Sequence, residues 1–143
     1  MQEQEKMKLQ PKAENKVIII ACAGMDKALG SVARHAAFEV TEKLRSDQTV
    51  LVCIPPLVAG VEPYAELVKT NVAIIVDGCA ERCATKIAVK SGAKIKGRVF
   101  IPLSAQKYGL KPATASNIGT DGEKLAEKVA EEIAAEIDKI TGK

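Results

Sequence analysis

The chain has 143 residues and a formal net charge of +3 at neutral pH, and a chain of this length can form one domain with its own hydrophobic core. The charge is too small to favour nucleic acid as a partner, and an aromatic content of 3% leaves few platforms for stacking bases. No apolar run approaches the length of a membrane span, so we expect no membrane insertion. The sequence indicates no particular protein partner.

The first sixteen residues are polar and carry charges of both signs. They lack the apolar centre of a signal peptide, which favours a protein that stays in the cytoplasm. We expect residues 1–16 to be a flexible tail and residues 17–143 to form a single α/β metal-binding domain.

Short apolar runs rich in β-branched residues alternate along the chain with helical patterns. The runs are typical of strands covered on both faces, and they lie at Val17–Ala21, Thr49–Val52, 72–76 and 98–101. Helical spacing is found over residues 29–44, 64–69 and 80–90. A fourth helical pattern runs from a capping box at 120–123 to the end of the chain. This alternation predicts an α/β three-layer sandwich with a four-stranded parallel sheet, strand order 2-1-3-4, and helices on both faces.

The segment from residue 102 to residue 117 contains no convincing strand or long helix, although a short helix could occupy 104–108. Loops of this length inside compact domains usually serve a function or are partly disordered. Because the segment leaves the carboxyl end of the fourth strand, we expect it to fold over that edge of the sheet as a lid. The alternative is a surface loop that merely covers the sheet.

The four cysteines follow the predicted strands. Cys22 comes directly after the first strand, Cys53 ends the second, and Cys79 lies three residues beyond the third. The carboxyl ends of parallel strands share one edge, so these thiols should converge there. Cys83, four residues after Cys79, is predicted on the same face of the next helix, near its positive end. Disulfides are disfavoured in the cytoplasm, so the four thiols predict a metal site, with zinc as the expected ion and Zn–S bonds of about 2.3 Å.

Other interpretations of these residues stay open. Cysteines often pack as small hydrophobic side chains, and the same four could hold an iron–sulfur cluster or perform thiol redox chemistry. The sequence does not decide whether the chain is an enzyme. A turn at residues 22–31 could hold a phosphate, but it lacks the lysine of a P-loop. His35, the only histidine, is expected to be structural. Asp77 could cap the following helix or support a metal ligand.

A resemblance to a known family rests on these same residues. The motif Asp-Gly-Cys at 77–79, Cys83 four residues later, Cys-Ala-Gly at 22–24 and Cys53 after the second strand together resemble the DGC-domain family. The resemblance is carried mainly by residues 17–101, and it does not explain the long segment that follows. Members of this family are described as binding zinc through their cysteines, while their cellular role is poorly defined. The resemblance implies that the metal ligands are Cys22, Cys53, Cys79 and Cys83.

Overall fold

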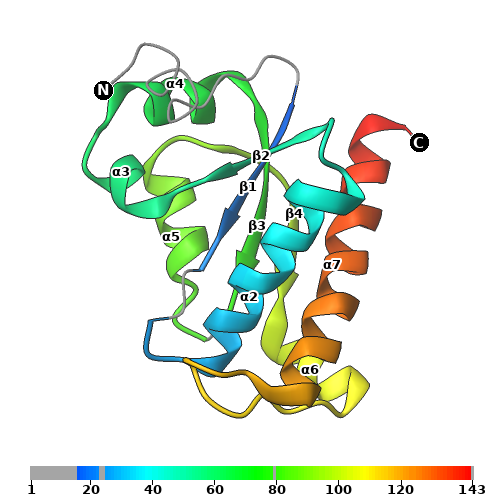
Figure 1. Ribbon diagram of the computed structural model, residues 1–143. Helices are drawn as coiled ribbons and strands as arrows, with labels where there is room; N and C mark the ends of the chain where they lie inside the picture. Colours follow the sequence, from blue (N-terminus) through cyan, green and yellow to red (C-terminus); the bar gives the residue numbers. More distant parts are fainter. Residues whose placement is uncertain (1–15, 23–24, 79, 143) are drawn as a thin grey trace, which may run out of the picture.

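The sheet of the protein is parallel, as the alternating sequence pattern predicted. The computed structural model describes residues 16–22, 25–78 and 80–142, and its four strands lie in the spatial order β2-β1-β3-β4. The strands are β1 Val17–Ala21, β2 Thr49–Val52, β3 Val72–Asp77 and β4 Lys94–Phe100. Figure 1 shows the carboxyl ends of β1 and β3 pointing to the same end of the molecule. The predicted fold class and strand order are therefore confirmed.

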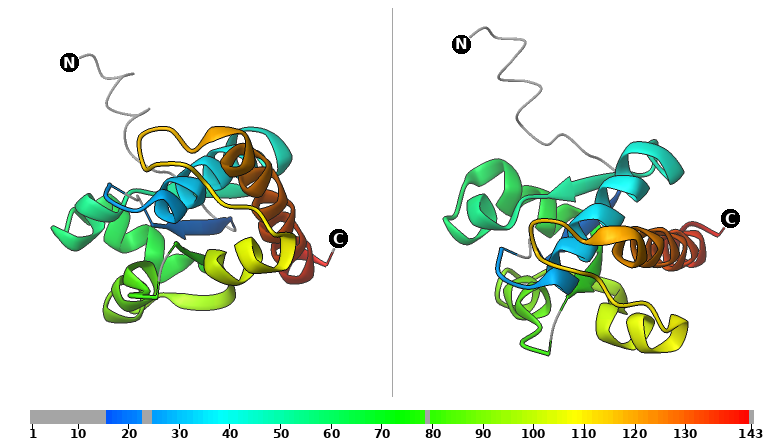
Figure 2. Two further views of the ribbon diagram at one scale, coloured as in Figure 1. Left: turned by 90° about the horizontal axis from the view of Figure 1, so that it is seen from below. Right: turned by 60° about the horizontal axis from the view of Figure 1, so that its bottom comes forward.

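Helices cover both faces of this sheet. One face carries α2 Ala28–Glu39, the π-helical turn η1 Val40–Leu44, α6 Ile101–Tyr108 and α7 Gly119–Thr141. The other face carries α3 Ile54–Val58, α4 Glu62–Thr70 and α5 Cys83–Lys90. In the view from below in Figure 2, α2 and α7 lie on one side of β1 and α5 lies on the other.

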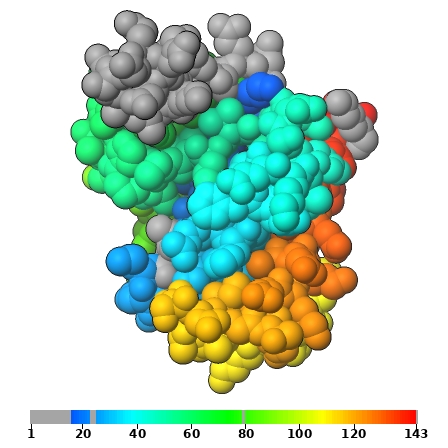
Figure 3. Space-filling view, in the orientation of Figure 1, coloured from blue at the N-terminus to red at the C-terminus, as the bar shows by residue number. Residues whose placement is uncertain are grey.

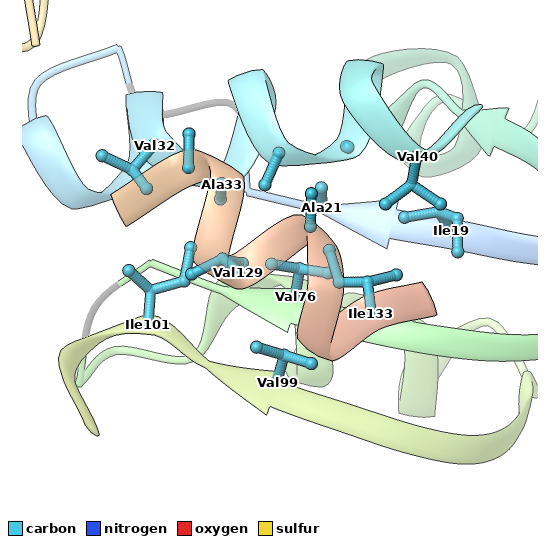
Figure 4. Close-up of a cluster of buried hydrophobic side chains, with 14 of the residues drawn as sticks. Ile19, Ala21, Val32, Ala33, Val40, Val76, Val99, Ile101, Val129 and Ile133 are labelled. Atoms are coloured by element: carbon cyan, nitrogen blue, oxygen red, sulfur yellow. The ribbon is translucent and has the colours of Figure 1, made fainter. Parts of the chain in front are cut away.

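Two clusters of buried apolar side chains fill the space between the sheet and its helices. Alternate residues of one strand point to opposite faces, so Ile19 joins the cluster under α2 and α7, whereas Ile18 joins the cluster under α4 and α5. Figure 4 shows the first cluster, in which Val76 of β3 and Val129 of α7 lie together. Because valine, isoleucine and alanine dominate both clusters, the fold needs few aromatic residues.

The fourth strand begins earlier than the sequence predicted. β4 spans Lys94–Phe100, whereas the apolar pattern indicated residues 98–101. The difference arises because β4 is an edge strand, in which exposed Lys94, Lys96 and Arg98 alternate with more buried residues. Charged residues on an edge strand discourage pairing with other chains, but they also interrupt the continuous apolar run that is typical of a buried strand.

Two helix starts also differ from prediction. The helix α7 begins at Gly119 after Ile118, whose side chain makes no capping hydrogen bond, so the expected capping box at residues 120–123 is not formed. Instead, the Gly119 N–H donates to Oδ1 of Asn117 at 3.1 Å. The helix expected over residues 80–90 begins only at Cys83, after Arg82 with a left-handed φ of 53°. A non-glycine residue rarely adopts this conformation, and it cannot continue a right-handed helix. Cys79 lies outside the described residues, so the prediction that it shares a helix face with Cys83 stays a prediction.

The amino-terminal end of the described chain is attached to the fold at Lys16, which we had assigned to the tail. The Lys16 backbone N–H donates a hydrogen bond of 3.0 Å to Oδ1 of Asn71, and its ammonium group contacts the carbonyl of Asp47. The rest of the predicted tail, residues 1–15, lies outside the described residues. Among the helices that the structure describes, none has the length and apolar character to cross a membrane.

Candidate metal centre

Three of the four predicted ligands lie where the elements end or begin at the carboxyl edge of the sheet. Cys22 follows β1, Cys53 lies between β2 and α3, and Cys83 is the first residue of α5. The backbone N–H of Cys22 donates to the carbonyl of Val76 in β3 at 3.0 Å, which extends the pairing of β1 and β3 by one residue. Cys79, the fourth predicted ligand, lies outside the described residues.

Cys22 and Cys53 line the same cavity, which has a volume of about 280 Å³ and lies between α2 and the start of α3. The register explains why: Ile20 of β1 is paired with Val52 of β2, so each cysteine lies one or two residues past this pair. Cys22 is half-buried and Cys53 is exposed. The structure thus brings these two predicted ligands to one cavity.

Cys83 is exposed at the amino-terminal end of α5, and both it and Cys53 are free thiols. Within the described ranges, no three His, Cys, Asp or Glu side chains are placed to hold a metal ion together. The three described cysteines therefore share an edge of the sheet without forming a metal cluster among themselves. The four-cysteine cluster stays a prediction, because it requires Cys79.

Asp77 holds the start of the helix that Cys83 begins. Its side chain is buried, with an exposure of 2%. The carboxylate accepts a hydrogen bond of 3.2 Å from the backbone N–H of Thr85 and a second from the Thr85 hydroxyl. This N–H belongs to the first turn of α5, where backbone donors lack partners within the helix. Of the two roles considered for Asp77, the structure bears out the helix cap, and support of a metal ligand stays a prediction.

A second contact holds the loop that precedes Cys83. The guanidinium carbon of Arg82 lies 4.0 Å from the centroid of the Phe100 ring, at the end of β4. A guanidinium over an aromatic face is attracted by the electron density of the ring. No pattern in the sequence pairs these two residues, so this contact was not predicted.

The predicted lid segment lies at the same edge. Its first part forms α6, and the remainder passes below the amino-terminal end of α2, as Figure 1 shows. There the hydroxyl of Ser31 in α2 donates to the carbonyl of Ala115 at 2.5 Å. Gly78, Leu110 and Pro112 line a cavity of about 370 Å³ between the segment and the loop after β3. The segment lies at the predicted edge but leaves Cys53 and Cys83 exposed, so a lid over the thiols stays a prediction.

The remaining candidates have simpler roles. His35 is exposed on α2, near Glu39 and Glu123, as expected for a surface residue. Ser31, at the end of the turn considered for phosphate, is buried and uses its hydroxyl to hold Ala115. Part of that turn, residues 23–24, lies outside the described residues.

Comparison with known proteins identifies one family. The sequence model described as the DGC domain matches residues 18–140 of the chain, which includes all four cysteines and the segment from 102 to 117. Neither the curated proteins nor the solved structures contain a significant match.

Proposed function

The chain belongs to the DGC-domain family, and on that basis we propose that it binds one zinc ion through Cys22, Cys53, Cys79 and Cys83. The observation that carries this proposal is the shared cavity of Cys22 and Cys53 at the carboxyl edge of the sheet. In open α/β sheets this edge is where ligands bind. Cys83 begins a helix at the same edge, and Cys79 precedes it by four residues.

The donor set suits zinc. Thiolate sulfur is a preferred ligand of Zn²⁺, and four thiolates complete its tetrahedral coordination. Cys53 and Cys83 are exposed free thiols, so an ion from solvent can reach them. Lys86 is exposed on α5, three residues after Cys83, so its positive charge favours the thiolate form of this cysteine.

The surrounding contacts support a site held in place by the fold. Asp77 binds Thr85 in the first turn of α5, and Arg82 stacks on Phe100. Both contacts restrain the backbone next to Cys83 without using a thiol. Because the two apolar clusters already fill both faces of the sheet, we expect the chain to fold without the ion. A site that stores or transfers zinc fits this arrangement better than a purely structural site.

Elemental analysis of protein purified without an affinity tag tests the proposal. We expect about one zinc per chain, and we expect Cys79→Ser and Cys83→Ser each to lose most of it, because serine removes the soft thiolate and keeps nearly the same volume. Met25→Leu is the matched control, since Met25 is an exposed sulfur side chain on the loop after β1. Full zinc content in both serine variants would overturn the proposal. Iron with visible absorbance would instead indicate an iron–sulfur cluster on the same cysteines.

A further inference from the structure

The cavity beside Cys22 and Cys53 is more than the space around two thiols, because most of its wall is apolar. The apolar lining comes from the edge of the sheet, from α2 and from the start of α3. These residues are Ala21, Ala37, Phe38, Leu51, Val52, Ile54 and Pro55. Figure 3 shows the hollow between the cyan surface of α2 and the green surface of the segment that contains α3.

The hollow exists because β2 is an edge strand. Leu51 points to the same sheet face as Ile19, and it is only partly buried against the cluster under α2. On this face, α2 packs over β1 and β3, and α7 packs over β3 and β4. The carboxyl end of β2 is left uncovered and forms the floor of the cavity. The volume of about 280 Å³ is just below the range of about 300–1,000 Å³ typical of small-molecule sites.

Phe38 forms the outer wall of this cavity. It is one of the two phenylalanines of the chain, and 42% of it is exposed. A single exposed apolar residue needs no explanation, whereas several that surround one concave site indicate a binding surface. Phe38 shares the cavity with Ile54 and Pro55.

Arg34 supplies the one positive charge among the residues that line the cavity. It lies one turn before Phe38 on α2, so both side chains lie on the same face of the helix. Arg34 is exposed, and within the described part of the chain it forms no ion pair. A guanidinium with five donors and no acceptor is suited to a carboxylate or a phosphate group.

We propose that this cavity binds a small organic anion, in which a chain or ring of a few carbon atoms carries one carboxylate or phosphate group. The anionic group pairs with Arg34, and the apolar part lies against Phe38 and Leu51. The proposal does not rest on the bound zinc, since the side chains that bind the anion are not the thiols. Its consequence for the metal site is that an occupied cavity covers the approach to Cys22 and Cys53.

The test uses the full chain as purified and three probes with the same six-carbon chain: hexanoate, hexyl phosphate and 1-hexanol. Backbone amide shifts in a ¹H–¹⁵N NMR titration report where each probe binds, and the two anions distinguish carboxylate from phosphate. We expect amide shifts at Phe38 and Leu51. We also expect the preferred anion, either hexanoate or hexyl phosphate, to bind roughly three- to tenfold more tightly than hexanol, as a partly exposed charge-assisted contact allows. No shift at these amides with any probe would overturn the proposal.

Two variants assign the binding energy. Arg34→Gln is expected to reduce the affinity for the preferred anion to that for hexanol, while Arg98→Gln, on the opposite edge strand β4, leaves it unchanged. Phe38→Ala is expected to weaken all three probes by a similar factor. An unchanged ratio of anion to hexanol affinity in Arg34→Gln would contradict the proposal. Self-association of the chain through its Phe38 surface would contradict it as well. Sedimentation would show this as a dimer of the wild type that is lost in Phe38→Ala. Zinc content measured in each variant keeps this result separate from the metal proposal.

Discussion

A Cβ atom built on Gly78 would lie 2.6 Å from Cα and 2.7 Å from the backbone nitrogen of Gly30. A Cβ atom essentially never lies so close to a backbone atom, so only a glycine fits where the loop after β3 meets the first turn of α2. The middle residue of the Asp-Gly-Cys motif is thus required for packing. The contact places the backbone that leads to Cys79 directly against α2, whose other residues line the cavity of Cys22 and Cys53.

Replacing Gly78 with alanine is expected to destabilise the fold by about 3 kcal/mol, at the upper end of overpacking effects, because the opposing atoms are backbone and cannot rotate away. Denaturant unfolding followed by circular dichroism measures the change. Gly60→Ala is the control: Gly60 has a φ of +79° and open space around its Cβ position, so its substitution carries only the cost of left-handed backbone, about 1–2 kcal/mol. A smaller loss for Gly78→Ala than for Gly60→Ala would contradict the packing argument.

Asp77 and Thr85 are expected to behave as a coupled pair. Asp77→Asn and Thr85→Val each remove part of a buried hydrogen-bonded contact, and a double-mutant cycle is expected to give a coupling free energy of about 1–3 kcal/mol. Thr141→Val is the matched control, since Thr141 is exposed and its hydroxyl donates to the Ile137 carbonyl of its own helix, a bond at the end of α7 away from Asp77. Its effect should stay within about 0.5 kcal/mol. Additive effects of the two substitutions would show that Asp77 does not cap α5.

Much of the fold could be predicted from the sequence because its central strands are covered on both faces. Their apolar runs end at residues that are easy to recognise, and alternation with helices then limits the topology. The edge strand β4 was placed too far along the chain because lysine and arginine interrupt its pattern. The start of α5 was missed because the left-handed backbone of Arg82 depends on tertiary contacts, including the one with Phe100.

Arg45 and Asp138 join η1 to α7 through a two-bond ion pair, with nitrogen–oxygen distances of 2.9 and 2.7 Å. The hydrogen bonds that Arg45 donates to the Asp138 carboxylate raise the pKa of Arg45; burial lowers this pKa, and the negative charge of Asp138 raises it further. We expect Arg45→Gln to cost about 1 kcal/mol, because both side chains remain partly exposed. Lys43→Gln, which removes a more exposed pair with Glu39, should cost almost nothing.

The pH dependence of this pair follows from the direction of the shift. A raised folded-state pKa of a base gives stability that is present below its ordinary pKa and lost only as the pH rises through the raised value. The guanidinium stays charged over roughly pH 6–9, so the difference in unfolding free energy between the wild type and Arg45→Gln should be constant there. A difference that changes by more than about 0.5 kcal/mol across this range would contradict the assignment.

Hydrogen exchange tests the proposed lid. The turn that faces α2 is held internally by N–H groups of Ala113 and Thr114, which bond Ile118 and Asn117, and externally by Ser31. Ser31→Ala should speed exchange at these two amides roughly three- to tenfold, as the loss of one hydrogen bond allows, without changing exchange in β1 or β3. Removal of zinc from the wild type should also speed it. Exchange that is the same with and without zinc would mean that the segment is a surface loop rather than a lid.

The candidate site was predictable only in part. The sequence placed Cys22, Cys53 and Cys83 correctly at one edge, because parallel strands end together. It could not show that Cys22 and Cys53 share a cavity with Phe38 and Arg34, since this depends on β2 being an edge strand that α2 leaves partly uncovered.

Zinc K-edge X-ray absorption of the tag-free protein tests the central claim most directly. We expect a first coordination shell of four sulfur atoms at about 2.3 Å, with the sulfur number falling to three in Cys53→Ser. This variant probes a ligand whose thiol is exposed and lines the shared cavity. A first shell made mainly of nitrogen or oxygen, or four sulfurs retained in Cys53→Ser, would contradict the account.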